Sequence, residues 1–442
     1  MNNRESGRNR VVAGYILIMS LCMCLGLAAH ALACSNVFVA ATNESTGETY
    51  AAVARSMDVW LWGDYFGYGL VGDQNTANIN IPQSGAVNAK QWTTAYGFIG
   101  QTAVGSYIVD DGVNTQGLYG GLLELPGFTQ FPEYNPADTR PELGVMDVMD
   151  YALGTAKDIP DLVNADTRTG KLLEVQTVLN AGEKDTQFHS FAGHIGFRDK
   201  NGNSAIVEWI KGQMHIYVHT AGTNQVVEII DGVPKYKKVY PNADASVLTN
   251  APPYSWHLQS VVQGGYNKMF NGNTNRKWDG SFMNGSALLG CAGDYTPVAR
   301  FLRGTTVARL FPKPLTQNQT MYAALSILQT IMVPLGANPE PSSWLAWVDL
   351  ENSIYNLKKL NDAYADQQGK VRNMHATINE QDLYAWQAYD CVAITSGTQP
   401  PPAGWTHVTV TPTAVISDPD EIRSAVAKPT DGNFKQNVYF LP

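Results

Sequence analysis

The residue best suited to covalent chemistry in this chain is Cys34, which follows the tripeptide Ala31-Leu32-Ala33 at the end of an apolar stretch. Small residues at the first and third positions of that tripeptide fit a signal-peptidase site. Cleavage after Ala33 would give Cys34 a free α-amino group, which titrates at about 7.7–8.0, beside a thiol that titrates at about 8.5. One residue would then supply both a nucleophile and a base near neutral pH.

Residues 1–33 are therefore predicted to be an export signal, and we expect the mature protein to be periplasmic or secreted. Basic residues precede an apolar stretch over residues 11–29. This stretch is longer than the about 7–15 residues of most signal h-regions, and it approaches the about 20 residues that span a bilayer. An uncleaved membrane anchor is thus one alternative to cleavage.

Lipidation of Cys34 is a second alternative. Bacterial lipidation sites usually carry Leu three residues before the cysteine, where this chain has Ala31. A lipid would block the α-amino group and alkylate the sulfur, and the product would be a non-catalytic envelope lipoprotein. The mass of the exported chain distinguishes these cases.

The composition is that of a globular protein with a substantial core. Hydrophobic residues make up 44% of the chain, and charged residues make up 16%, below the typical value of about 25%. The net charge of −9 gives no reason to expect nucleic-acid or anionic-membrane partners. We find no strong domain boundary after the signal and expect residues 34–442 to form a single domain, with a proline triplet at 400–402 before a short final segment.

No sequence motif indicates a metal or a cofactor. The chain lacks His-Glu-x-x-His, a P-loop and a dinucleotide-binding glycine pattern, and the mature part lacks Cys-x-x-Cys. Cys291 and Cys391 remain beside Cys34 after removal of the signal. They form either one disulfide or two buried thiols, because spacing does not show proximity.

The mature chain is predicted to begin with a hairpin. Residues 34–41 and 49–58 alternate as strands do, and the polar segment 43–48 between them has a turn composition. Folding this hairpin about its centre places Cys34 opposite Met57, with Arg55 and Asp58 close by. These two charged residues have opposite strand parity, so a bulge or the strand end would have to redirect one of them.

Further along the chain, strand patterns come first, helical patterns follow and strand patterns return, which favours a layered α+β domain. An aromatic, glycine-punctuated loop is expected over 60–69, and helical spacing occurs within 143–182 and 305–333. Strands are expected over 106–125 with a turn at 114–117, over 195–208 and 213–219 with a turn at 200–203, and over 344–357.

Five blocks of the chain resemble the choloylglycine hydrolase family, a group of N-terminal-nucleophile hydrolases that includes penicillin V acylases and bile salt hydrolases. Each block is short, but together they follow the family's order, and the resemblance covers the mature chain to about residue 360. They are Cys34-Ser-Asn-Val, Ala54-Arg-Ser-Met-Asp58, Asp111-Gly-Val-Asn-Thr-Gln-Gly-Leu118, Ser246-Val-Leu-Thr-Asn-Ala-Pro252 and Gly293-Asp-Tyr-Thr-Pro-Val-Ala-Arg-Phe301.

The resemblance implies a four-layer αββα sandwich with the nucleophile at the start of a central strand. It also implies hydrolysis of the linear amide of a small N-acyl substrate through an acyl-enzyme thioester, without a cofactor, by a homotetramer. An N-acyl homoserine lactone acylase would use the same machinery with a long aliphatic pocket, and it is the alternative enzyme.

The resemblance also implies roles for four residues besides Cys34. Arg55 would favour the thiolate, and Asp58 would orient the α-amino group. Asn250 would donate to the oxyanion, and Arg300 would complete a charged network around Arg55 and Asp58. Simpler interpretations stay open at this point: a surface ion pair between Arg55 and Asp58, a turn at Asn250 and a helix-surface arginine at 300.

Two features bear on the substrate. Glu124 stands where the family usually has Asn, Tyr or Trp at its second oxyanion position. A backbone N–H there would still serve the oxyanion, but an ionised carboxylate would repel anionic substrates. The aromatic segment over 60–69 is the candidate acyl pocket, and the alternative is that its rings only pack in the core. The candidate pocket residues are Trp60, Trp62, Tyr65 and Phe66.

Overall fold

The computed structural model describes most of the chain between residues 33 and 359 and five backbone segments beyond it. Residues 1–32 of the predicted signal, Trp60, Trp62, Cys291 and the proline triplet lie outside the described residues, and Tyr65, Phe66 and Cys391 are described by backbone alone. The described residues are 33–58, 65–69, 71–77, 79, 88–102, 109–179, 192–241, 243, 245–263, 293–334, 342, 344–359, 373–379, 382–388, 391–395, 406–408 and 439–440.

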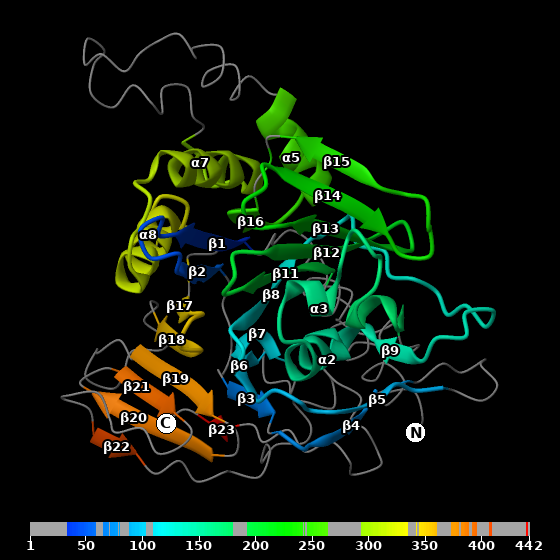
Figure 1. Ribbon diagram of the computed structural model, residues 1–442, viewed down its shortest axis with the longest axis horizontal. Coiled ribbons are helices and arrows are strands. Elements are labelled where there is room, and N and C mark those ends of the chain that lie inside the picture. The colour runs from blue at the N-terminus through cyan, green and yellow to red at the C-terminus, as the bar shows by residue number, and fades with distance from the viewer. Residues whose placement is uncertain are drawn as a thin grey trace, which may run out of the picture.

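Two large, mainly antiparallel sheets form the centre of the molecule (Figure 1). The first has nine described strands, in the order β16 (Val247–Thr249), β1 (Ala33–Thr42), β2 (Thr49–Asp58), β17 (Trp344–Asp349), β18 (Ile354–Lys359), β19 (Asn373–Asn379), β21 (Cys391–Thr395), β20 (Asp382–Ala388) and β22 (Thr406–Val408).

The second sheet has ten described strands, and two small strand pairs accompany it. Its order is β15 (Lys238–Pro241), β14 (Gln225–Ile230), β13 (Gln213–His219), β12 (Ser204–Ile210), β11 (Gly193–Asp199), β8 (Leu118–Glu124), β7 (Val109–Asn114), β6 (Phe98–Thr102), β3 (Tyr65–Gly69) and β23 (Tyr439–Phe440). The pairs are β4 (Gln74–Thr76) with β5 (Gln91–Thr93), and β9 (Glu142–Gly144) with β10 (Gln176–Val178).

Helices cover the outer faces of both sheets, which gives the expected α+β sandwich. Helices α7 (Pro297–Leu310) and α8 (Gln317–Gln329) pack against β1 and β2, whereas α2 (Val148–Thr155) and α3 (Ile159–Leu162) lie on the second sheet. Helix α5 (Tyr254–Gln263) contacts α7. One apolar cluster fills the space between the sheets and below α8, and another lies below α2.

The predicted hairpins are confirmed, whereas the bounds of the predicted helices and the aromatic loop need correction. Within 143–182, the helical spacing corresponds to short helices, of which α2 is the longest described, and β9 and β10 lie on either side of them. The predicted helix at 305 begins earlier, at Pro297, where the Thr296 hydroxyl accepts the Ala299 N–H and caps the helix. The aromatic segment is a strand, not a loop, from Tyr65 onward.

The N-terminal hairpin has the predicted register. In the turn, the Asn43 N–H donates to the Glu48 carbonyl at 2.8 Å and the Asn43 carbonyl accepts the Gly47 N–H at 2.7 Å. Gly47 has a φ of 76°, which glycine adopts without steric cost. The pairing of β1 with β2 is uninterrupted, and Cys34 lies opposite Met57. Among the described strands, β1 pairs with β16 on one side and β2 on the other, and β16 is the last strand on its side. Within this described sheet, β1 is thus not central as the family resemblance implied.

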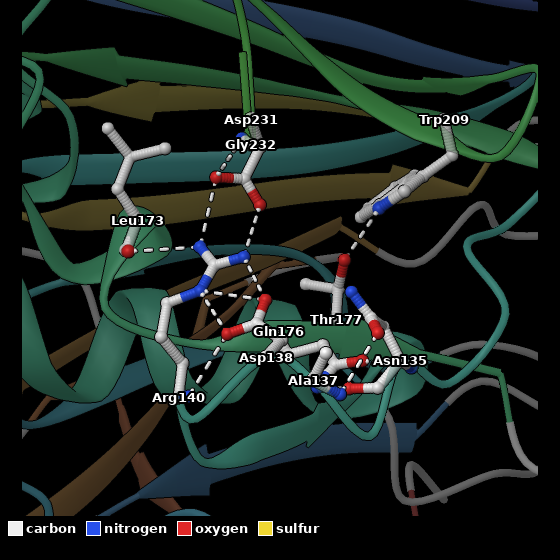
Figure 2. A network of polar contacts seen from close by, with 10 residues as sticks. All are labelled: Asn135, Ala137, Asp138, Arg140, Leu173, Gln176, Thr177, Trp209, Asp231 and Gly232. Atoms are coloured by element: carbon white, nitrogen blue, oxygen red, sulfur yellow. Dashed lines mark hydrogen bonds and ion pairs between the residues drawn. The ribbon is translucent and has the colours of Figure 1, made fainter. Parts of the chain in front are cut away.

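A polar cluster around Arg140 ties together three loops on the α2 side of the molecule (Figure 2). The Arg140 guanidinium forms two-point contacts with Asp138 and with Asp231, and donates to the Leu173 carbonyl at 3.1 Å. The side-chain hydrogen bonds from Arg140, together with its backbone N–H and its positive charge, hold the pKa of Asp138 below the ordinary value. Because such planar two-point pairs are directional, this cluster fixes the loop that leads into β9.

Candidate active site

The two faces of the N-terminal hairpin carry different parts of the candidate site. Side chains alternate along a strand, and directly opposed residues share a face. Cys34 and its partner Met57 therefore share the face that looks toward the second sheet, where Asn36 donates to the Tyr119 hydroxyl at 2.9 Å. Asp58 lies on the other face, toward α7, so the opposite directions of Arg55 and Asp58 need no bulge.

The Cys34 thiol is buried, with 1% of the residue exposed. Its Sγ lies 3.3 Å from the Met57 Sδ. Burial raises the pKa of the thiol to about 11, the positive charge of Arg55 opposes this rise, and the negative charges of Asp58 and Glu124 add to it. The thiol is therefore neutral at pH 7, and it needs a base before it can attack a carbonyl.

Arg55 is fully buried and forms its ion pair with Asp111 of β7, at 2.6 Å. The same guanidinium donates to the Asp110 carbonyl at 3.1 Å and to the Leu122 carbonyl. Asp111 also accepts a hydrogen bond from the Tyr119 hydroxyl. A surface pair between Arg55 and Asp58 is thus wrong, and so is the expectation that Arg300 holds Arg55.

Arg300 is also fully buried, because the first turns of α7 press it against the start of β1. Its guanidinium donates to the Cys34 carbonyl and the Ser35 hydroxyl, both at 2.6 Å, and lies 3.5 Å from the Asp58 carboxylate. A second nitrogen donates to the Asn250 Oδ1 at 3.0 Å. The interpretation of Arg300 as a helix-surface arginine is therefore wrong.

Asp58 lies between Arg300 and Ser342, whose hydroxyl donates to the carboxylate. Burial raises the pKa of Asp58 to about 6, although the Arg300 charge and the Ser342 hydrogen bond both act to lower it. The carboxylate is mostly ionised at pH 7, but its pKa lies only about one unit below this pH. Loss of the Arg300 charge would raise that pKa further, so ionisation of Asp58 depends on Arg300.

Asn250 follows β16 directly and is 1% exposed. Its Oδ1 accepts the N–H of Cys34, and its Nδ2 donates to the Glu124 carbonyl at 3.0 Å. With Ala33 still attached, Asn250 and not Asp58 thus binds the nitrogen of Cys34. An amide carries two N–H donors, so the Glu124 carbonyl uses one of them.

Glu124 ends strand β8, and the backbone pattern shows where its own N–H points. The next residue, Leu125, donates its N–H to Ala192 beside β11 at 2.6 Å. Because successive residues of a strand point their backbone groups to opposite edges, the Glu124 N–H points to the other edge. That is the edge on which the Glu124 carbonyl meets Asn250. The half-buried side chain acts on Cys34 through its charge.

The structure therefore brings together Cys34, Arg55, Asp58, Asn250 and Arg300, with the Glu124 backbone at their side. Sequence reasoning missed the roles of Asp111, Tyr119 and Ser342 as partners of these residues. The Asp-Gly-x-Asn block offered a signal for Asp111, whereas nothing in the sequence marks Ser342. The candidate pocket residues Trp60 and Trp62, and the side chains of Tyr65 and Phe66, stay predictions.

Within the described residues, no group of three or more His, Cys, Asp and Glu side chains is arranged to hold a metal ion. No helix among the same residues has both the length and the apolar character needed to cross a bilayer.

Comparison with known proteins gives matches over most of the chain that follows the predicted signal. A family model described as linear amide C–N hydrolases, choloylglycine hydrolase family, matches residues 41–227 and 226–355. A penicillin V acylase of Pectobacterium atrosepticum is 24% identical over 377 residues, which cover 77% of this chain and 85% of the relative.

Solved structures share the fold at low sequence identity. The penicillin V acylase from Agrobacterium tumefaciens matches with a TM-score of 0.52 and 18% identity, over 78% of this chain and 86% of that one. A variant of the conjugated bile acid hydrolase from Clostridium perfringens matches with a TM-score of 0.53 and 15% identity, over 77% and 91% of the two chains.

Proposed function

Because the chain belongs to the choloylglycine hydrolase family of linear amide C–N hydrolases, we propose that it is an exported amidohydrolase whose mature N-terminus is Cys34. It cleaves the amide of a small N-acyl substrate through a thioester on Cys34. The observation that carries this proposal is the position of Asn250, whose amide meets both the nitrogen of Cys34 and the end of β8.

The base for this reaction is the α-amino group that cleavage after Ala33 would release. A buried thiol with a pKa of about 11 carries only about 10⁻⁴ of its population as thiolate at pH 7. An amine on the same residue removes that limit, because it takes the proton as the sulfur attacks. Asn250 Oδ1 already accepts from this nitrogen, and it would orient the free amine in the same way.

The steps follow from this arrangement. The sulfur bonds to the carbonyl carbon while its proton passes to the amine, and the carbonyl electron pair moves onto the oxygen. The second N–H of Asn250 and the backbone N–H of Glu124 stabilise that oxyanion. When the oxyanion collapses, the C–N bond breaks and the leaving nitrogen takes the proton. Water then attacks the thioester carbonyl while the same amine takes its proton. The C–S bond breaks, the acyl group leaves as a carboxylic acid, and the sulfur takes the proton back from the amine.

The two buried arginines hold this machinery in place. Arg55 brings a positive charge to the thiol from one face of the hairpin, and Asp111 fixes its position. Arg300 binds the Cys34 carbonyl and the Asn250 Oδ1 from the other face. The nucleophile and the oxyanion donor are thus positioned by one guanidinium, which avoids reorganisation during the reaction.

The substrate class is an N-acyl amide of the kind named for the relatives. We rank penicillin V first, conjugated bile salts second and N-acyl homoserine lactones third, since the relative from Pectobacterium atrosepticum is a penicillin V acylase. The test is expression of the full chain in a Gram-negative host, intact mass of the exported protein, and hydrolysis of one member of each substrate class.

The expected mass is that of unmodified residues 34–442, and the expected activity is release of the free amine from at least one of the amides. A diacylglycerol adduct, or full activity in a protein that retains Met1, would overturn the proposal. A correctly cleaved protein that hydrolyses none of the three classes would contradict the proposed substrate class.

Glu124→Gln should make Cys34 more reactive. The Glu124 charge raises the thiol pKa, so its removal lowers that pKa and increases the thiolate fraction below pH 9. We expect alkylation of Cys34 by iodoacetamide at pH 8 to accelerate about threefold, corresponding to about half a pKa unit. Hydrolysis of taurine-conjugated substrates, which are anionic, should improve relative to neutral amides. Glu174→Gln, which removes an exposed charge on the α2 side, is the matched control.

A further inference from the structure

A buried histidine contacts the backbone of the candidate oxyanion residue. His257, in the first turns of α5, has no exposed surface, and its Nε2 lies 3.0 Å from the Asn250 carbonyl oxygen. A carbonyl only accepts hydrogen bonds, so Nε2 carries a proton and donates it. The Asn250 carbonyl lies just beyond the paired part of β16, where the ladder to β1 ends at Thr249.

The His257 ring is held by the helix that carries Arg300. It stacks on Phe301 with ring centroids 4.4 Å apart and an angle of 26° between the planes. Phe301 directly follows Arg300, whose guanidinium binds the Asn250 Oδ1. The backbone and the side chain of Asn250 are therefore held from neighbouring positions, one through His257 and the other through Arg300.

The start of α5 is fixed from the second sheet. Glu208 of β12 is fully buried and accepts the Tyr254 N–H at 2.8 Å. The same carboxylate oxygen lies 2.8 Å from the Nδ1 of His194 on β11. A carboxylate at a helix N-terminus is stabilised by the helix dipole, so the Glu208 contact fixes the helix that presents His257.

We propose that His257 is a positioning residue for Asn250: its hydrogen bond to the Asn250 carbonyl, supported by Phe301 and Glu208, sets the orientation of the Asn250 amide toward Cys34. This inference rests on the proposed role of Asn250 as an oxyanion donor. A donor acts only if it lies at about 2.7–3.1 Å from the developing oxyanion. A small rotation of the Asn250 peptide would therefore slow acylation without removing any group that touches the substrate.

The test compares His257→Gln with His257→Met in the mature enzyme. Both side chains are unbranched and similar in size, but only glutamine keeps an N–H near the position of Nε2. We expect His257→Met to lower kcat about 10- to 100-fold with KM changed less than about threefold, and His257→Gln to regain most of the loss. Alkylation of Cys34 by iodoacetamide forms no oxyanion but uses the same amine as base, so in His257→Met it should fall less than kcat does, and His257→Gln should restore it.

Controls separate positioning from general destabilisation. Met214→Ala, a truncation in the apolar cluster below α2, should lower the melting temperature while leaving kcat unchanged. If the His257 variants do not fold, Phe301→Leu keeps the donor and removes the stacked ring, and it should give a smaller kcat loss of the same kind. Wild-type kcat in a folded His257→Met, or an equal loss in both His257 variants, would overturn the inference.

Crystal structures of the wild-type protein and His257→Met show the position of the Asn250 amide, and this test needs no substrate. The inference expects the Asn250 amide to leave the Cys34 nitrogen in the variant, and an unmoved amide contradicts it. A wild-type enzyme that cleaves no acyl amide would instead contradict the proposed function, so the two failures are distinguishable.

Discussion

Cys34→Ser is expected to lower kcat for amide hydrolysis by about 10³-fold or more while the protein still folds. A hydroxyl is a far weaker acid than a thiol, and the α-amino group, with a pKa of about 7.7–8.0, cannot deprotonate it effectively. The exchange replaces one atom in a buried site, so the fold should survive. Intact mass should first show that the variant also begins at residue 34, so that both proteins contain the same base.

The matched control for Cys34→Ser is the double variant Cys291→Ser/Cys391→Ser. It removes the other two cysteines of the mature chain and should keep turnover near the wild-type value. Iodoacetamide should inactivate this double variant and the wild type equally, and it should find no reactive thiol at position 34 in Cys34→Ser. Unchanged hydrolysis in Cys34→Ser would exclude the sulfur as the nucleophile.

The hairpin that carries Cys34 could be predicted because its determinants are local. Strand alternation and a turn composition over 43–48 fix which residues of β1 and β2 face each other, and the predicted pair of Cys34 with Met57 is confirmed. The family resemblance added Asn250 and Arg300, which no local pattern connects to Cys34. The structure places both beside it.

The partners of these residues could not be predicted, since they come from the facing sheet and from distant loops. Asp111 is 56 positions from Arg55, and Ser342 is 284 positions from Asp58. Strand parity showed that Arg55 and Asp58 point to opposite faces, but it carries no information about which strand or helix covers each face. This is why a single network around Arg300 was expected where the structure has two separate ion pairs.

Arg300→Met should combine a large loss of activity with a large loss of stability. The variant removes the contacts to the Cys34 carbonyl, Ser35 and Asn250, and it leaves Asp58 as a buried, unpaired charge. Breaking such a buried pair by removing one partner costs about 3–5 kcal/mol. Misplacement of the nucleophile and its oxyanion donor should lower kcat about 100-fold or more. Denaturant unfolding and steady-state kinetics measure the two effects.

Arg303→Met is the matched control, because Arg303 lies one turn further along α7 and binds backbone carbonyls at the exposed surface. Its unfolding free energy and kcat should stay near wild type. In the double variant Arg300→Met/Asp58→Asn, removal of the unpaired charge should recover part of the lost stability. Equal stabilities of Arg300→Met and the double variant would show that Asp58 carries no charge that Arg300 compensates.

The pH dependence of Arg300→Met gives an independent check with a defined sign. In the wild type, the pKa of Asp58 is raised to about 6, so the folded state favours the protonated carboxyl and loses stability as pH rises from the unfolded value toward 6. Removal of Arg300 raises this pKa further and extends the loss above pH 6. The deficit of Arg300→Met relative to wild type should therefore be smaller at pH 5 than at pH 8, and the part that remains at pH 5 reflects the lost contacts to Cys34, Ser35 and Asn250. A deficit that is the same at pH 5 and pH 8 would mean that Arg300 acts through packing and these hydrogen bonds and not through the Asp58 charge.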